Sequence, residues 1–120
     1  MTEFKDEKTT VQEMKDLIFQ FAKDRDWIHY HTPKNLSMAL TVEAGELMEH
    51  FMWLNDKEVD ELKNTEKIND VRDELADIVT YALEIANVMN IDLAESIQKK
   101  YKKNCLKYPE EECQKVFEKK

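Results

Sequence analysis

Four carboxylates, arranged as two pairs, are the residues of this chain whose types and spacing best suit chemistry. Glu43 pairs with Glu46, and Glu74 pairs with Asp77, each three residues apart in a stretch whose pattern predicts helix. Residues i and i+3 of a helix lie on the same side, so each pair presents two acids together. Four acids facing the inside of a small helical protein are costly unless a cation occupies them. The spacing therefore predicts a metal site.

Glu43 is the acid that a surface location explains least. On a helix over about residues 36–53 it lies in the middle of an apolar side formed by Leu36, Leu40, Leu47, Phe51 and Leu54. Burying an unpaired carboxylate costs on the order of several kcal/mol, which a cation would offset. Glu46, Glu74 and Asp77 taken alone would suit a solvated helix face equally well. Glu43 favours the metal.

The donor set favours a hard cation. A di-iron bundle needs Glu-x-x-His pairs on two helices, but His50 is four residues after Glu46 and the other acid pair has no histidine. Zinc would need a convergent set of His and Cys ligands. Carboxylates alone suit Mg²⁺ or Mn²⁺, which commonly bridge phosphate oxygens. Hydrolysis of a phosphate ester or phosphoanhydride is the chemistry that these residues predict.

Gly45 is the only glycine of the chain, and it falls inside the helix that carries the first acid pair. Glycine costs roughly 1 kcal/mol relative to alanine in a helix interior. Such a residue usually has a packing or functional reason, and we expect a backbone or a ligand to approach it beside Glu46. A simply tolerated glycine is the alternative.

The apolar spacing predicts an all-α, four-helix bundle-like subunit. Thr10 and Glu13 form a capping box that opens the first helix, Pro33 lies in a loop before the second, and Asp92 caps the fourth. The expected helices cover about residues 10–26, 36–53, 65–89 and 92–107, with a short acidic piece before residue 64 and flexible tails over 1–8 and 110–120. In this arrangement Trp53 and Tyr81 would flank the acids.

Composition narrows the class of protein. A length of 120 residues predicts one domain, and a net charge of −8 argues against a nucleic-acid binder. No apolar run is long enough for a membrane span. The first residues lack the basic-then-apolar order of a secretory signal, and the two cysteines, Cys105 and Cys113, are expected to be reduced thiols. We expect a cytoplasmic protein.

The motifs together resemble those of a known family. Glu43-Ala-Gly-Glu46-Leu-Met-Glu49 followed by Glu74-Leu-Ala-Asp77 is similar to the ExxE and ExxD signature of the MazG-like all-α nucleoside triphosphate pyrophosphohydrolases. The likeness is greatest to the dCTP pyrophosphatase branch and covers about residues 20–109. Its further segments are Arg25-Asp26-Trp27, His31-x-Pro33-Lys34-Asn35-Leu36, Phe51-x-Trp53 and Lys100-x-x-x-Asn104-x-x-Lys107-Tyr108-Pro109.

The resemblance implies a function and a role for each residue. Family members cut a (deoxy)nucleoside triphosphate between its α- and β-phosphates with Mg²⁺, which removes unwanted nucleotides. Glu43, Glu46, Glu74 and Asp77 would bind the metal, and one of them would orient the water. Lys34, Lys100 and Asn104 would hold phosphate oxygens, although Lys34 stands where the branch often carries Arg and so lacks the bidentate fork. His31, Trp53, Tyr81 and Trp27 would shape the pocket for base and sugar.

The resemblance also implies homo-oligomers, usually tetramers built as dimers of dimers. Two other functions stay open at this point. The chain could be a non-catalytic helical module that binds a partner, or a related pyrophosphohydrolase that acts on dUTP or a modified nucleotide.

Overall fold

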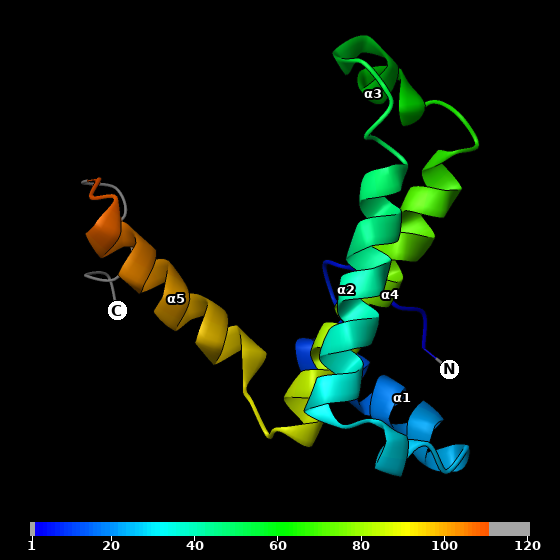
Figure 1. Cartoon of the computed structure of the whole chain (residues 1–120). Coiled ribbons are helices and arrows are strands. Elements are labelled where there is room, and N and C mark those ends of the chain that lie inside the picture. The colour runs from blue at the N-terminus through cyan, green and yellow to red at the C-terminus, as the bar shows by residue number, and fades with distance from the viewer. Residues whose placement is uncertain (1, 111–120) are drawn as a thin grey trace. The chain divides into compact units, whose positions relative to one another are not determined.

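The computed structural model describes residues 2–110, and every element in that range is helical. Within these residues five α-helices and one 3₁₀ helix follow one another, and Figure 1 traces their course. They are α1 (Val11–Asp24), η1 (Ile28–Tyr30), α2 (Pro33–Glu49), α3 (Asp56–Leu62), α4 (Ile68–Val88) and α5 (Leu93–Lys107). This confirms the all-α class. No helix within residues 2–110 has the length and apolar character that crossing a membrane requires.

The chain divides into two compact units, residues 1–90 and 91–120. The first unit contains α1 to α4, and the second contains α5. The prediction of one domain over the whole chain stays a prediction. Of the expected tails, residues 5–9 form a turn in which the Lys5 N–H donates to the Thr9 hydroxyl at 2.8 Å. Residues 111–120 lie outside the described residues.

The predicted helix caps are present. The Thr10 hydroxyl accepts from the Glu13 N–H at 3.0 Å, and the Glu13 carboxylate accepts from the Thr10 N–H at 3.1 Å, which completes the capping box of α1. The Asp92 carboxylate accepts from the Glu95 N–H at 3.0 Å at the start of α5. Asn90 lies just beyond α4 with a φ of 57°, the left-handed conformation that often ends a helix.

The prediction for the second helix was wrong at both ends. Pro33 is the first residue of α2 instead of part of a loop, and Thr32 is the cap, its hydroxyl accepting from the Asn35 N–H at 3.1 Å. A proline at this position loses nothing, because the first N–H of a helix has no partner within the helix. The helix ends at Glu49, and turns follow it up to residue 54.

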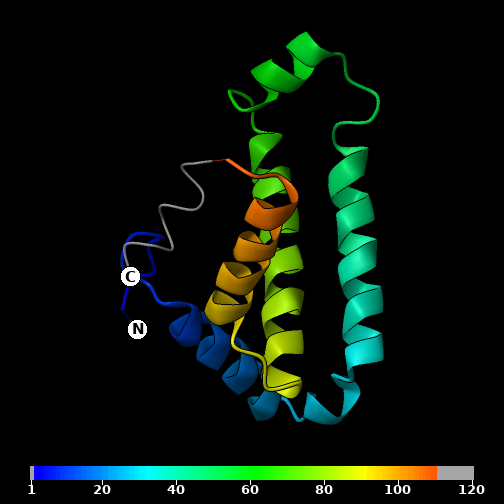
Figure 2. The ribbon, with the colours of Figure 1, turned by 90° about the vertical axis from the view of Figure 1, so that its left-hand side faces the viewer.

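Packing within the first unit is centred on α4. Helices α2 and α4 lie side by side and run in opposite directions, α1 packs against α4, and α3 lies at the end remote from α1 (Figures 1 and 2). The buried apolar residues of this unit include Ala22 on α1, Leu36 on α2, and Leu83 and Ala86 on α4. This packing fixes the register of α2 against α4, and therefore which side chains of the two helices meet.

In the second unit, α5 carries the buried Cys105. Cys105 takes part in a disulfide, which differs from the expected reduced thiol. The spacing of cysteines does not fix the distance between their Cα atoms, on which disulfide formation depends. Cys113 lies outside the described residues.

Candidate active site

Three of the four predicted carboxylates meet between α2 and α4. One oxygen each of Glu43, Glu46 and Glu74 lies within 4.8 Å of the others, a grouping that could hold a metal ion. The Oε2 atoms of Glu43 and Glu74 are buried and have no hydrogen-bond partner among the described residues. Buried polar atoms normally have a partner. The unpartnered oxygens therefore fit a cation.

The charges in this group act on one another. The pKa of Glu43 is raised above its ordinary value, chiefly because a protonated Glu43 can hydrogen-bond to the Glu74 carboxylate, and then because of its burial. A contact with Glu46 lowers this pKa, while the charges of Glu74 and Asp77 raise it further. Repulsion makes it costly for these neighbouring carboxylates to be ionised together, and a bound cation would offset that cost.

Asp77 does not belong to the group of three. It is exposed on α4, one helical turn after Glu74. Its charge nevertheless raises the pKa of Glu43 and that of Tyr81. Burial is the larger cause for Tyr81, so its phenol stays an O–H donor at neutral pH.

His50 has a place beside the acids that the sequence did not reveal. Its Nε2 lies 3.8 Å from Glu74 Oε1, and it is buried without a hydrogen-bond partner among the described residues. Helical spacing puts His50 on the same edge of the helix as Glu46, but no role at the site was predicted for it. Its spacing of four residues from Glu46 was the signal, because i and i+4 share a helix face.

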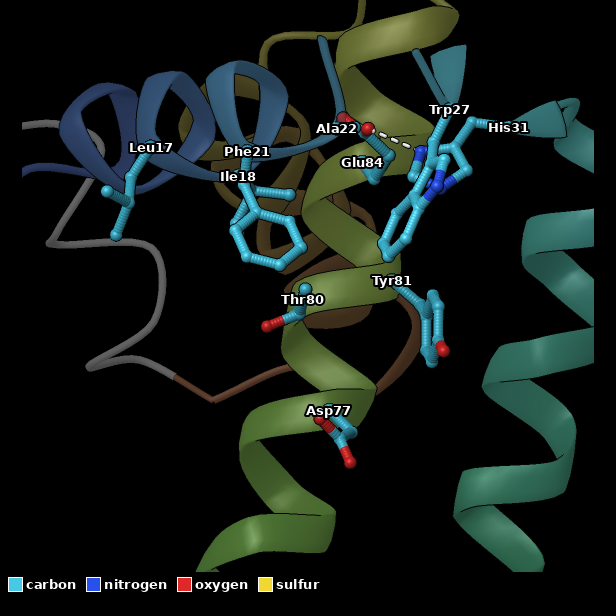
Figure 3. A pocket seen from close by; sticks show the side chains of 10 residues that line it. All are labelled: Leu17, Ile18, Phe21, Ala22, Trp27, His31, Asp77, Thr80, Tyr81 and Glu84. Carbon is cyan, nitrogen blue, oxygen red and sulfur yellow. Dashed lines mark hydrogen bonds and ion pairs between the residues drawn. The ribbon is translucent and has the colours of Figure 1, made fainter. Parts of the chain in front are cut away.

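A pocket of about 350 Å³ lies next to Asp77 (Figure 3). Helix α1 provides one wall, the segment around η1 a second and α4 a third. Its lining residues are Leu17, Ile18, Phe21, Ala22, Trp27, His31, Asp77, Thr80, Tyr81 and Glu84. The structure thus brings together Trp27, His31 and Tyr81, three of the four residues expected to shape the base and sugar pocket.

Glu84 is the lining residue that sequence reasoning missed. It is only 1% exposed, and its Oε2 lies 2.6 Å from His31 Nδ1. Its position one residue before Ile85, which the pattern placed on the apolar side of the helix, was a weak signal. The packing of α1 against α4, together with the His31 contact, makes the site of Glu84 an interior one.

Within the first unit, two predicted residues, Trp53 and Lys34, do not line the pocket. Trp53 follows the end of α2 and is 83% exposed. Lys34 is exposed in the first turn of α2 and does not line the pocket. Lys100 and Asn104 belong to the second unit, where they line a shallow depression on α5 together. Their roles stay predictions.

Gly45 has no close neighbour within the described part of the chain, since a Cβ added there would meet nothing within 4 Å. The expected close approach of a backbone or ligand is therefore not made by this chain itself.

The helical fold is shared with a solved structure, a pyrophosphatase from Archaeoglobus fulgidus DSM 4304. The two superimpose with a TM-score of 0.77 at 32% sequence identity, over 92% of this chain and 99% of the other. The chain therefore has the all-α fold of that pyrophosphatase.

The sequence gives the family. Residues 38–120 match the MazG-like family. The dCTP pyrophosphatase 1 of Rattus norvegicus and that of Homo sapiens are each 33% identical to the chain over 101 residues, which are 83% of its length. The matched part spans 59% of the length of these relatives. The chain belongs to the MazG-like family, as its motifs predicted.

Proposed function

We propose that the protein hydrolyses a (deoxy)nucleoside triphosphate to the monophosphate and pyrophosphate, with dCTP as the first candidate substrate. The observation that carries this proposal is the meeting of Glu43, Glu46 and Glu74 close to a pocket lined by aromatic rings. Two of these acids, Glu43 and Glu74, have a buried oxygen without a partner in the described part of the chain. The acid group suits a metal–phosphate complex, and the pocket suits a base. Membership of the MazG-like family and likeness to dCTP pyrophosphatases support it.

The cofactor proposed for this site is Mg²⁺, with Mn²⁺ as a substitute. Both take oxygen ligands, and the donors brought together by α2 and α4 are carboxylates. A bound cation would polarise the phosphoryl oxygens and offset the charge that develops on the leaving group. Glu43, Glu46 and Glu74 would hold it, and Asp77 would complete the set from the pocket side.

The reaction assigns a task to each part of the site. The oxygen of an attacking water forms a bond to the α- or the β-phosphorus, and the bond between that same phosphorus and the bridging oxygen breaks. One of the carboxylates would orient this water and accept its proton. Trp27 and Tyr81 would contact the base and sugar, since any base can stack on an aromatic ring. Lys34, Lys100 and Asn104 remain the proposed phosphate-holding residues, with Trp53 a further aromatic contact.

The proposed assembly is a homo-oligomer, a tetramer built as a dimer of dimers. Large apolar side chains are exposed along α2 and beyond its end, among them Met38 at 58%, Val42 at 60% and Trp53 at 83%. Exposed apolar surface of this kind usually marks an interaction site. A second copy would cover it. The proposed setting is the cytoplasm, where the activity would clean up the nucleotide pool.

The test is a panel of purified nucleotides, with pyrophosphate and orthophosphate measured separately. It contains the common ribonucleoside and deoxynucleoside triphosphates, dUTP and cytidine triphosphates substituted at position 5, each with and without Mg²⁺. We expect pyrophosphate from at least one deoxynucleotide and none after chelation. Orthophosphate as the product, or no turnover of any nucleotide, would contradict the proposal. The second result would favour a non-catalytic helical module.

A further inference from the structure

Glu84 is a charged residue in the interior of the first unit. It lies on α4 one turn beyond Tyr81 and two turns beyond Asp77, so the three side chains form one wall of the pocket (Figure 3). Its exposed fraction is 1%. A buried carboxylate is costly unless hydrogen bonds and charge partners satisfy it. The partners of Glu84 therefore determine what this residue can do.

Both oxygens of Glu84 are satisfied by the protein itself. Oε2 lies 2.6 Å from His31 Nδ1, and Oε1 accepts from the Asn87 side-chain amide at 2.9 Å. The same amide donates to the Lys15 carbonyl of α1 at 2.9 Å. The carboxylate is thus held by His31 and Asn87, and Asn87 links it to α1. Glu43 and Glu74, by contrast, each have an oxygen with no partner within residues 2–110, which is what a metal ligand needs.

The contact fixes the imidazole of His31. An ionised carboxylate only accepts hydrogen bonds, so the hydrogen between the two groups belongs to Nδ1. Nε2 is then the ring nitrogen that remains for other interactions. His31 follows η1 on the connection to α2, and this side-chain bond ties it to a residue 53 positions away in the sequence. Because Nδ1 is bound in this way, the imidazole keeps both its tautomer and its ring orientation.

A fixed polar group matters because much of the pocket is apolar. Leu17, Ile18, Phe21 and Ala22 line it from α1, with the Trp27 ring beside them (Figure 3). In such a pocket a few polar groups select the ligand, because a mismatched ligand leaves them buried without a partner. We propose that Glu84 is a positioning residue, which holds His31 so that the imidazole selects the base of the bound nucleotide. This inference rests on the proposed function for the identity of the ligand.

The first test needs no substrate. The chain has three histidines, His29, His31 and His50, so the imidazole resonances in long-range ¹H–¹⁵N spectra are few enough to assign by substitution. We expect the Nδ1-protonated form for His31 in the full chain, and loss of this fixed state in Glu84→Ala. The spectrum of Asp70→Asn, which alters an exposed acid of the same helix, should match that of the unchanged protein. A His31 ring protonated only on Nε2 would overturn the proposal.

The second test measures selection. The ratio of kcat/KM between the preferred nucleotide and the next should fall about tenfold in Glu84→Ala, comparable to the low end of the loss seen when the partner of a metal-bound histidine is removed. The ratio should fall less in Glu84→Gln, because this variant keeps an oxygen that can accept from Nδ1. His31→Ala should lose as much selectivity as Glu84→Ala, and the double variant should lose no more selectivity than either single variant. Full selectivity in folded Glu84→Ala, with selectivity lost in His31→Ala, would contradict the proposal.

The two tests separate the possible failures. If Glu84→Ala does not fold, as judged by circular dichroism, Glu84→Gln and His31→Gln provide the same comparison with smaller changes in packing. If the unchanged protein turns over no nucleotide, the proposed function fails. The spectra of His31 then still decide whether Glu84 positions the ring.

Discussion

Glu84 on α4 is buried and Glu43 on α2 is half-buried, and their oxygens have different surroundings. Glu84 has a partner for each oxygen, His31 on one and Asn87 on the other. Glu43 faces Glu74 and Glu46, and its Oε2 has no partner among the described residues. A satisfied carboxylate orients its neighbours, whereas an unsatisfied one among like charges attracts a cation. The two acids therefore belong to different parts of the site.

The raised pKa of Glu43 leads to a prediction about stability. A carboxyl whose pKa is higher in the folded state than in the unfolded state favours folding at low pH, and this contribution is lost as the pH rises through the folded-state value. At neutral pH without metal, the charge of Glu43 therefore opposes folding. Glu43→Gln should raise the melting temperature at pH 7 in chelator, and the difference should vanish below the ordinary carboxyl value of 4.5.

Added Mg²⁺ should reverse the order of the two proteins. A ligand that binds only the folded state at 100 times its Kd contributes about 2.7 kcal/mol, which the unchanged protein should gain and Glu43→Gln should largely lose. Thermal melts with and without Mg²⁺ measure both effects. A lower melting temperature for Glu43→Gln in chelator would show that the acid stabilises the metal-free fold, against this account.

At the scale of the elements, the helix caps were predictable and the ends of α2 were not. Thr10 and Asp92 satisfy N–H groups a few residues away, so the local sequence contains the whole signal. Pro33 suits both a loop and a first helical turn, and the choice depends on Thr32 and on packing. The early end of α2 at Glu49 also explains Trp53, since a helical projection fails beyond the end of its helix.

Gly45 gives a prediction for α2. Because a Cβ there meets nothing within 4 Å, Gly45→Ala should stabilise the folded chain by about 1 kcal/mol, the gain in helix propensity. Its mass by light scattering should equal that of the unchanged protein, which we expect to be oligomeric. Chemical unfolding measures the stability. Loss of stability together with a smaller mass would instead mean that another copy packs closely against Gly45.

At the scale of the whole molecule, the all-α class and the three acids that meet, Glu43, Glu46 and Glu74, were predictable from the sequence. The sequence could not predict Glu84 as an interior residue, because its burial depends on how α1 and His31 pack against α4 and not on helical periodicity. Helical spacing put Glu74 at the edge of the apolar side and Asp77 further round, but it could not show that only Glu74 joins Glu43 and Glu46. Which acids meet depends on the register between α2 and α4.

The central claim is that these converging acids support cleavage of a nucleoside triphosphate between its α- and β-phosphates. The most direct measurement is pyrophosphate release with Mg²⁺ by Glu46→Gln, beside Glu61→Gln as a control on the exposed surface of α3. We predict that Glu46→Gln loses most of the activity, at least about a hundredfold, since a metal ligand has been removed, while Glu61→Gln keeps it. Unchanged pyrophosphate release by a folded Glu46→Gln would contradict the account.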